Sequence, residues 1–261
     1  MAKLTNQIAF ITGGGRGIGR SIAELLGKEG AHVIVTDIDL AGAQSVANEI
    51  EQKGGKAASL ALDVSQSSQV AAVMNQVVEK FGRIDILVNN AGIAGNPKWV
   101  DEISDQEWTR MFDIHVNGSF YCLREAAKVM KKNRYGRIVN LSSCAAVTGL
   151  AGLSHYAAAK YAIVGLTETA AMELGVYNIT VNAIKPGVIR TALTDGFLEL
   201  AGSVLTDATP VRRLGDPIDV ARLVTALVSP EFGFVTGCSY IVDGGFHLVT
   251  EMDKTMLKML S

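Results

Sequence analysis

Near its start the chain reads Ile8-Ala-Phe-Ile-Thr12-Gly13-Gly14-Gly15-Arg16-Gly17-Ile18-Gly19, and this stretch decides the fold. A short, largely apolar strand runs directly into a glycine-rich turn, and a helical pattern begins at Gly17. Glycines let a backbone approach a pyrophosphate closely, and a helix N-terminus offers unbonded N–H groups and a positive dipole end. The spacing Gly13-x-x-x-Gly17-x-Gly19 departs from G-x-G-x-x-G, but its place between a strand and a helix favours a dinucleotide-binding turn.

The rest of the chain continues the alternation of strand and helix. Near-continuous apolar runs, typical of strands buried on both faces, predict strands at Ile8–Thr12, His32–Thr36, Ala57–Leu62, Ile84–Asn89, Arg137–Leu141, Ile179–Ile184 and Ser239–Val242. Helical patterns lie near Gly17–Glu29, Leu40–Gln52, Ser67–Lys80, Ser104–Lys132, Tyr156–Gly175 and Pro217–Val228. We therefore predict an α/β fold: one doubly wound, Rossmann-type domain over residues 1–261, with a mainly parallel seven-stranded sheet and helices on both faces.

Composition excludes several classes of function. The 261 residues are 48% hydrophobic, and the net charge of −2 comes from interspersed charges of both signs, so we expect no nucleic-acid and no membrane partner. Cys122, Cys144 and Cys238 are odd in number and far apart, with neither disulfide nor zinc spacing. We expect no metal site and a reducing, cytoplasmic location. No signal-peptide pattern opens the chain.

Asp37 ends the second predicted strand, eighteen residues after Gly19. A carboxylate there can accept hydrogen bonds from adenosine ribose hydroxyls and would repel a 2′-phosphate, which favours NAD over NADP. Arg16 argues the other way, because its guanidinium could pair with that phosphate. Asp37 could instead cap the helix that begins near Leu40, a task for which Asp39 is equally suited. We give Asp37 the greater weight and predict NAD.

Tyr156-Ala-Ala-Ala-Lys160 places a phenol and an ammonium one helical turn apart. The ammonium should favour the phenolate and lower the pKa of the tyrosine, which would let it exchange a proton with an alcohol or carbonyl oxygen. The spacing alone is a weak motif, because chance produces a Tyr-x-x-x-Lys in such a chain about one time in four. Its meaning depends on the other motifs.

Those motifs follow in a consistent order. Besides the glycine turn, they are Asp63-Val64, Asn89-Asn90-Ala91-Gly92, Asn117, Ser143, Tyr156 with Lys160, the segment from Pro186 to Thr191, and Val242-Asp243-Gly244-Gly245. In this order and spacing, over nearly the whole chain, they resemble the short-chain dehydrogenase/reductase family.

The resemblance implies a catalytic set of Asn117, Ser143, Tyr156 and Lys160. Tyr156 would be the general acid/base, and Lys160 would lower its pKa and hold the nicotinamide ribose. Ser143 would hydrogen-bond the substrate oxygen, and Asn117 would hold a water that links Lys160 to solvent. Because Asn117 and Gly118 are poor mid-helix residues, we also expect a local kink there.

The resemblance, with the glycine turn and Asp37, predicts an NAD site formed by Gly13, Gly15, Arg16, Gly17, Ile18, Gly19, Asp37, Asp63, Val64, Asn90, Ala91, Gly92, Tyr156, Lys160, Pro186, Gly187, Ile189 and Thr191. Substrate contacts are expected from Ser143, Ala145, Leu150, Tyr156 and Leu193. A mobile substrate loop is predicted from about 187 to 215, because this long stretch carries several glycines. The segments expected to line the pocket are mostly apolar, which favours a small neutral ketone or secondary alcohol. His155 adjoins Tyr156 but cannot share its helix face, so it reads as a rim or structural residue.

The tail from 246 to 261 carries Val249, Met252, Met256 and Leu260 at helical spacing. It would cover the chain's own core or a neighbouring subunit. The resemblance implies a homotetramer, formed through the helices that hold Asn117 and Tyr156 and through this tail.

The predicted function is transfer of a hydride between NAD(H) and a secondary alcohol or ketone. Two enzymatic alternatives stay open: a 3-oxoacyl-[acyl-carrier-protein] reductase, which usually takes NADPH, and a sugar or polyol dehydrogenase. A regulator that senses NAD without turnover is the alternative outside enzymes. The presence of Ser143, Tyr156, Lys160 and Asn117 argues against it.

Overall fold

A single parallel sheet forms the centre of the computed structural model, which describes residues 3–192 and 194–249. Its seven strands lie in the order β3-β2-β1-β4-β5-β6-β7, and every neighbouring pair is parallel. They are β1 (Ile8–Thr12), β2 (His32–Asp37), β3 (Lys56–Ala61), β4 (Ile86–Asn89), β5 (Gly136–Leu141), β6 (Ile179–Pro186) and β7 (Ser239–Val242). All seven predicted strands are confirmed, with ends shifted by no more than two residues.

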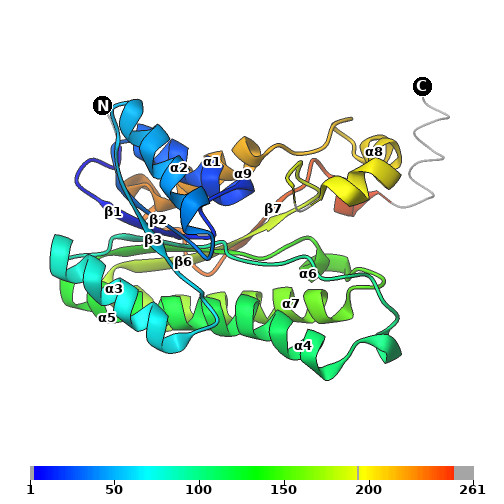
Figure 1. Ribbon diagram of the computed structural model, residues 1–261, viewed down its shortest axis with the longest axis horizontal. Coiled ribbons are helices and arrows are strands. Elements are labelled where there is room, and N and C mark those ends of the chain that lie inside the picture. The colour runs from blue at the N-terminus through cyan, green and yellow to red at the C-terminus, as the bar shows by residue number, and fades with distance from the viewer. Residues whose placement is uncertain (1–2, 193, 250–261) are drawn as a thin grey trace.

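Helices cover both faces of the sheet, as predicted (Figure 1). The α-helices are α1 (Gly17–Lys28), α2 (Leu40–Gln52), α3 (Ser67–Phe81), α4 (Asp105–Phe112), α5 (Gly118–Asn133), α6 (Ala145–Thr148), α7 (Ser154–Leu174), α8 (Asp195–Ala208) and α9 (Pro217–Val228). Short helical turns are η1 (Val100–Glu102), η2 (Asp113–Asn117), η3 (Gly175–Tyr177), η4 (Pro230–Phe232) and η5 (Phe246–Leu248).

Two apolar cores hold these layers together. One lies between the sheet and α1, α2 and α9, with buried side chains such as Ile22, Val46 and Val224. The other lies between the sheet and α3, α5 and α7, with Met74 and Met130 among its largest members. Because the strands are buried on both faces, their sequences read as continuous apolar runs rather than as alternating ones.

The fourth predicted helix, Ser104–Lys132, is interrupted. Ser104 begins it with a capping box, because its Oγ accepts from Glu107 N at 3.3 Å and the Glu107 carboxylate accepts from Ser104 N at 3.0 Å. The π turn η2 then separates α4 from α5, and Gly118 N donates to Asp113 O. The kink expected beside Asn117 is thus a π turn, a geometry that proteins often place at functional sites.

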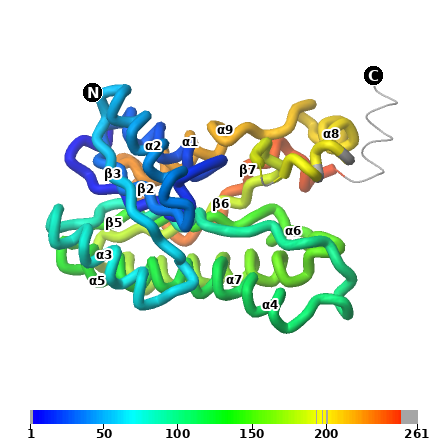
Figure 2. The backbone as a smooth tube through the Cα atoms, in the orientation of Figure 1, coloured from blue at the N-terminus to red at the C-terminus, as the bar shows by residue number. Residues whose placement is uncertain are grey.

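The predicted substrate loop from 187 to 215 is not a continuous loop. Asp195–Ala208 within it forms α8, which the glycines in this stretch concealed. Figures 1 and 2 show α8 and α6 at the same end of the molecule, beyond the carboxyl ends of β6 and β5, which they follow in the chain. Of the tail, η5 and Val249 are described, whereas Met252, Met256 and Leu260 lie outside the described residues.

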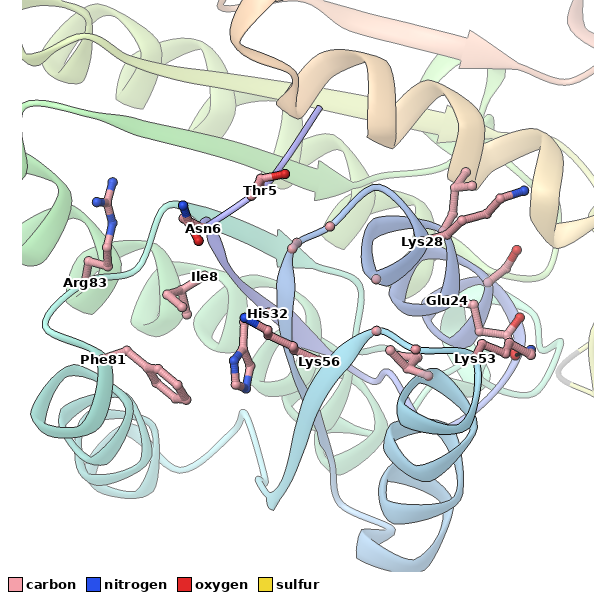
Figure 3. Close-up of a pocket in the computed structure, with 18 of the residues that line it drawn as sticks. Thr5, Asn6, Ile8, Glu24, Lys28, His32, Lys53, Lys56, Phe81 and Arg83 are labelled. Carbon is pink, nitrogen blue, oxygen red and sulfur yellow. Dashed lines mark ion pairs between the residues drawn. The ribbon is translucent and has the colours of Figure 1, made fainter. Parts of the chain in front are cut away.

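A hollow of about 960 Å³ lies at the opposite end of the sheet (Figure 3). The first residues of β1, β2 and β3 and the carboxyl ends of α1 and α3 line it, and its basic side chains include Lys28 and Lys53. Lysines at helix carboxyl ends offset the negative dipole there, which accounts for this charge without a ligand. Within residues 3–192 and 194–249, no helix is long and apolar enough to cross a membrane, and no cluster of side chains fits a metal ion.

A buried network of hydrogen bonds joins β4 and β5, in the middle of the sheet, to α7. Asn89 Nδ2 donates to Asn140 Oδ1 at 2.9 Å, and Asn140 Nδ2 donates to Thr167 Oγ1 at 2.9 Å. Thr167 in turn donates to Ile163 O at 2.7 Å. Since Asn140 is fully buried, both of its hydrogen bonds are made without competition from water.

We predict that Asn140→Ala lowers the free energy of unfolding by about 2–4 kcal/mol, because two buried hydrogen bonds and side-chain volume are lost together. Urea denaturation measures the change. Gln44→Ala, which removes two exposed hydrogen bonds, with Ser59 and with Asn48, is the matched control and should change stability by less than about 0.5 kcal/mol. Equal effects of the two substitutions would contradict the role given to the buried network.

Candidate active site

The turn between β1 and α1 has backbone geometry that suits glycine. Gly13 and Gly17 have φ angles of +61° and +55°. A Cβ atom on Gly13 would lie 2.8 Å from Ala91 Cα. Arg16 precedes α1 without a side-chain cap, so the first N–H groups of the helix are available for an anion.

Two side chains fasten this turn to the end of β4. Thr12 Oγ1 accepts from Asn90 N at 3.0 Å and from Ala91 N at 3.1 Å. Asn90 Nδ2 donates to Thr12 O at 3.0 Å and to Gly13 O at 2.8 Å. The link lies where the strand order changes direction, between β1 and β4, which is the position where open α/β sheets bind their ligands.

A cavity of about 350 Å³ opens at this position. It collects residues from the carboxyl ends of several strands and from α7. Its lining includes Gly13, Arg16, Gly17, Ile18, Asp37, Asp63, Val64, Asn90, Ala91, Gly92, Ser143, Tyr156, Lys160, Pro186, Gly187, Ile189 and Thr191. An elongated group that reaches from the glycine turn to Tyr156 therefore fits the residues present.

Asp37 is held at one end of the cavity. Its carboxylate accepts from Gly15 N at 3.0 Å and from Asp39 N at 3.0 Å. The helix-cap role belongs to Asp39, whose side chain accepts from Ala41 N at 3.1 Å. Asp37 therefore remains available to the cavity, and the exposed Ile38 beside it brings no positive charge.

Tyr156, Lys160 and Ser143 meet at the other end. Lys160 is only 5% exposed, and its Nζ lies 5.5 Å from the centre of the Tyr156 ring and donates to Leu141 O at 2.8 Å. Ser143 Oγ accepts from Ala145 N at 3.1 Å and is hydrogen-bonded to Tyr156. The neighbouring Ser142 also borders the cavity, but its buried hydroxyl donates to Lys160 O at 2.8 Å, which leaves Ser143 as the hydroxyl available to a substrate.

The expected lowering of the Tyr156 pKa by Lys160 is not found, because burial is the largest influence on that pKa. Burial raises the pKa of Tyr156, the hydrogen bond with Ser143 opposes that rise, and Cys144 adds to it. Burial also lowers the pKa of Lys160 from 10.5 to about 7. Desolvation is thus the dominant influence on the pKa values of both groups.

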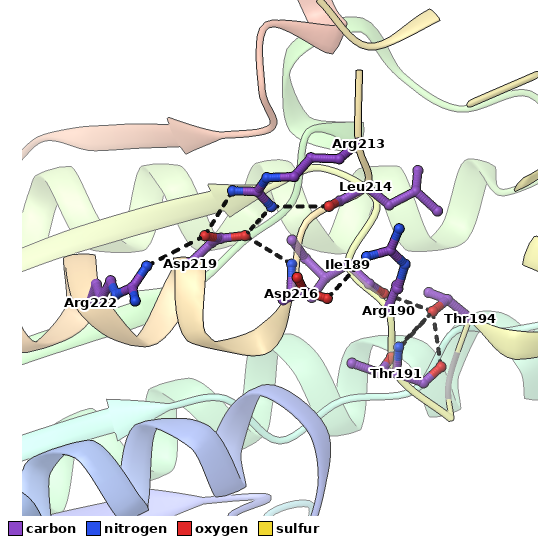
Figure 4. A network of polar contacts seen from close by, with 9 residues as sticks. All are labelled: Ile189, Arg190, Thr191, Thr194, Arg213, Leu214, Asp216, Asp219 and Arg222. Atoms are coloured by element: carbon purple, nitrogen blue, oxygen red, sulfur yellow. Dashed lines mark hydrogen bonds and ion pairs between the residues drawn. The ribbon is translucent and has the colours of Figure 1, made fainter. Parts of the chain in front are cut away.

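Polar contacts hold the edge of the cavity near Ile189 and Thr191 in place (Figure 4). Thr194 Oγ1 donates to Ile189 O at 2.7 Å and accepts from Thr191 N at 3.1 Å, before α8 begins. After α8, Arg213 and Asp219 pair at 2.6 Å. These contacts fix the two ends of the segment that contains α8.

The segment after β7 packs against the chain next to Ser143, outside the described cavity lining. The Asp243 carboxylate accepts from Gly245 N at 2.8 Å and from His247 N at 2.8 Å. It also accepts from the Cys144 thiol at 3.6 Å, next to Ser143. Burial, together with this carboxylate, raises the pKa of Cys144 to about 12, so the thiol stays protonated.

Comparison with known proteins decides the family. A family model described as enoyl-(acyl carrier protein) reductase matches residues 13–247. Cyclohexanol dehydrogenase of Acinetobacter sp. (strain SE19) is 38% identical over 244 residues, which cover 94% of this chain and 96% of that protein. The chain belongs to the short-chain dehydrogenase/reductase family.

Two further relatives agree with that assignment. The 3-oxoacyl-[acyl-carrier-protein] reductase FabG of Thermotoga maritima is 37% identical over 243 residues, covering 93% of this chain and 98% of that protein. The crystal structure of levodione reductase superposes with a TM-score of 0.91 at 32% identity, covering 95% of this chain and 100% of that one. As a short-chain dehydrogenase/reductase, the protein is an oxidoreductase that acts on CH–OH groups, in a family that uses nicotinamide cofactors.

Two predicted cofactor residues stand behind the cavity wall rather than in it. A Cβ atom on Gly15 would lie 3.0 Å from Asp37 Oδ2, and one on Gly19 would collide with Gly13 O. These two glycines shape the dinucleotide turn of this family member by allowing close packing.

The structure does not bring the Asn117 side chain into the site. Asn117 Nδ2 donates to Asp113 Oδ1 at 2.8 Å, within the π turn, and Asn117 is absent from the described cavity lining. His115, two residues earlier, lines the cavity instead. Sequence reasoning missed His115, because a lone histidine in an apolar helical stretch usually signals a core residue.

The substrate residues are only partly placed. Ser143 and Tyr156 line the cavity, whereas Ala145 is buried at the start of α6 and Leu150 is 49% exposed. Among the described residues that line the cavity, neither Ala145 nor Leu150 occurs. Leu193 lies outside the described residues. His155 is buried and also absent from that lining, in agreement with the structural role expected for it.

We predict that Lys160→Met changes the pH dependence of stability. Because the pKa of Lys160 falls from 10.5 to about 7 on folding, the unfolded chain binds more protons between these values. The wild-type free energy of unfolding should therefore rise with pH, relative to that of the variant, from about pH 7 to about pH 10. Urea denaturation at pH 6, 8 and 10 measures this difference. Lys132→Met, at an exposed position of α5, is the matched control, and a difference that stays constant for Lys160→Met would contradict the prediction.

Proposed function

We propose that this enzyme transfers a hydride between NAD(H) and a small neutral secondary alcohol or ketone, with Tyr156 as the general acid/base. The observation that carries the proposal is that one cavity joins Asp37 and the glycine turn to Ser143, Tyr156 and Lys160. A nicotinamide cofactor, when bound, supplies or accepts the hydride.

The side chains around Tyr156 suit the exchange of one proton. In ketone reduction the Tyr156 hydroxyl would give its proton to the carbonyl oxygen, and in alcohol oxidation the phenolate would take one. Because burial raises the pKa of Tyr156, the phenol stays protonated and can donate its proton during ketone reduction. Ser143 would donate a hydrogen bond to the same oxygen and steady the charge that develops on it. Lys160 would hold the ribose of the nicotinamide half.

Asp37 supports NAD as the preferred cofactor. Its carboxylate is fixed by Gly15 N and Asp39 N at the cavity end where the adenosine ribose would lie. A 2′-phosphate there would meet a like charge. Arg16 lines the same cavity and is the one feature that favours NADP.

Similarity to cyclohexanol dehydrogenase supports a neutral substrate, since cyclohexanol is the substrate that its name gives. The second candidate is a 3-oxoacyl-[acyl-carrier-protein] reductase, supported by the similarity to FabG. Against it, Arg190 and Arg213 beside the cavity are paired with Asp216 and Asp219, which reduces the positive charge available to an acidic carrier protein.

Exposed apolar side chains support the proposed homotetramer. They lie on α4, α5 and α7, the helices around the site, and are Trp108, Phe120, Tyr161 and Met172. Free thiols at Cys122, Cys144 and Cys238 accord with the proposed cytoplasmic location.

A substrate panel tests the proposal directly. Cyclic and linear secondary alcohols and ketones, polyols, and an acyl thioester should each be assayed with NAD(H) and NADP(H) by absorbance of the reduced cofactor. We expect turnover of neutral alcohols or ketones with NAD(H). Preference for the thioester with NADPH would replace the proposal by the second candidate, and polyol preference would indicate a sugar or polyol dehydrogenase. Cofactor binding without any turnover would indicate a regulator.

Tyr156→Phe should lower kcat by at least about 10²-fold, because the proton donor is removed from the site. Binding of NADH, measured by fluorescence, should change little. Tyr161→Phe, five residues further along α7 and hydrogen-bonded to Val147 O, is the matched control and should keep its activity. Retention of activity in Tyr156→Phe would exclude the proton-transfer role.

Asp37→Asn should lower the ratio of kcat/KM for NAD to that for NADP by about tenfold or more, because the repelling charge is lost. The amide oxygen can still accept from Gly15 N, so this substitution separates charge from structure. Asp39→Asn removes a neighbouring charge that caps α2 and should leave the ratio nearly unchanged. An unchanged ratio in Asp37→Asn would mean that another group selects the cofactor.

A further inference from the structure

His115 occupies a position in the active site that the proposed chemistry does not use. It lies in the π turn η2, is 2% exposed and lines the cavity together with Tyr156 and Lys160. A π turn inserts an extra residue into a helix, which redirects the side chains around it. Here the turn places an imidazole against the wall of the site.

The ring contacts Tyr156 directly. The ring centroids of His115 and Tyr156 are 5.5 Å apart, with an interplanar angle of 89°. This is the edge-to-face arrangement that aromatic pairs prefer. Together with the hydrogen bond to Ser143, this contact restricts the direction in which the Tyr156 hydroxyl points.

The same ring holds the chain that follows β4. Its Nε2 lies 3.1 Å from Ile93 N and 2.9 Å from Ile93 O. In one neutral tautomer Nε2 accepts from the Ile93 N–H, and in the other it donates to the Ile93 carbonyl. Either way, the ring fastens the Ile93 backbone.

The ring is held in its neutral form. Burial lowers its pKa well below 6.5, and the nearby Lys160 adds to that effect. His155 acts in the same direction, whereas the hydrogen bond to Ile93 opposes it. A neutral ring adds no charge beside Lys160, so its contribution is one of shape and hydrogen bonding.

Gly92 leaves room for this ring. A Cβ atom at position 92 would collide with His115 Cε1 and lie 3.0 Å from His115 Nδ1. The φ angle of Gly92 does not require glycine, since it is not among the glycines with positive φ. The absence of a side chain at this position is therefore explained by the imidazole that packs on it.

We propose that His115 is a positioning residue, which orients the Tyr156 phenol and the Ile93 backbone as one unit, and that Gly92 is matched to it. The proposal rests on the proposed proton-transfer role of Tyr156. The two proposals can be tested separately. If Tyr156→Phe is inactive and the His115 variants keep full activity, only the positioning proposal is overturned. An active Tyr156→Phe would overturn both.

Three substitutions divide the contacts of His115. His115→Phe keeps the aromatic edge and loses the bond to Ile93, His115→Asn keeps a polar group and loses the ring, and His115→Ala loses both. We expect kcat to fall by about 100-fold in His115→Ala and by about tenfold in His115→Phe and His115→Asn, because a misplaced catalytic group costs rate even when the shift is small. The KM and Kd for the cofactor should stay within about twofold, since a positioning role acts on kcat.

Gly92→Ala gives an independent test by a double-mutant cycle. In the wild-type background it should lower kcat by about tenfold, because the new methyl group displaces the ring. In the His115→Ala background it should lower kcat further by less than about twofold, because the space is then empty. Additive losses would overturn the proposed match between Gly92 and His115.

His32→Ala is the matched control. His32 also packs edge-on against an aromatic ring, that of Phe81, at the far end of the sheet (Figure 3). The two ring centroids are 4.5 Å apart. It should lose thermal stability and keep its kcat. The positioning role would be overturned if kcat of His115→Ala stayed within about twofold of wild type, or if cofactor affinity fell as much as kcat. If His115→Ala does not fold, unchanged kcat in both His115→Phe and His115→Asn would overturn it equally.

Discussion

The hydrogen bonds between Thr12 and Asn90 are the constraint on which the rest of the site depends. They join the first strand to the fourth across the point where the sheet reverses its order, and they fix Gly13 at the same time. They add side-chain hydrogen bonds to the pairing of β1 with β4, and so couple the glycine turn to the chain that follows β4. The glycine turn, where a pyrophosphate would bind, is therefore held in a fixed position relative to Gly92 and Ile93.

Desolvation sets the chemical character of the other end of the site. It raises the pKa of Tyr156, lowers those of Lys160 and His115, and raises that of Cys144, so every one of these groups is biased toward its neutral form. Neutral side chains at this end of the cavity are consistent with the neutral substrate proposed for it. It also means that any group which stabilises the Lys160 ammonium would simultaneously bring Tyr156 closer to proton exchange at neutral pH.

Much of the fold and of the cavity lining could be predicted from the sequence, because continuous apolar strands and a glycine turn are local signals. The remainder depended on packing. In α8, Gly196 and Gly202 weakened a helix pattern that is nevertheless formed. The π turn shifted the helix register, so His115 rather than Asn117 reached the cavity. The pKa values of Tyr156 and Lys160 followed burial, which residue spacing along a helix does not reveal.

The bridge between Ile189 and Gly215 has a consequence for how such enzymes diversify. It brings the two ends of the α8 segment side by side, so the residues between them form one loop that leaves the sheet framework and returns to it at the same place. The entropy of closing such a loop grows only slowly with its length. Insertions, deletions or whole exchanged cassettes can therefore be accepted here while the hydride and proton machinery keeps its shape, which lets specificity evolve separately from catalysis.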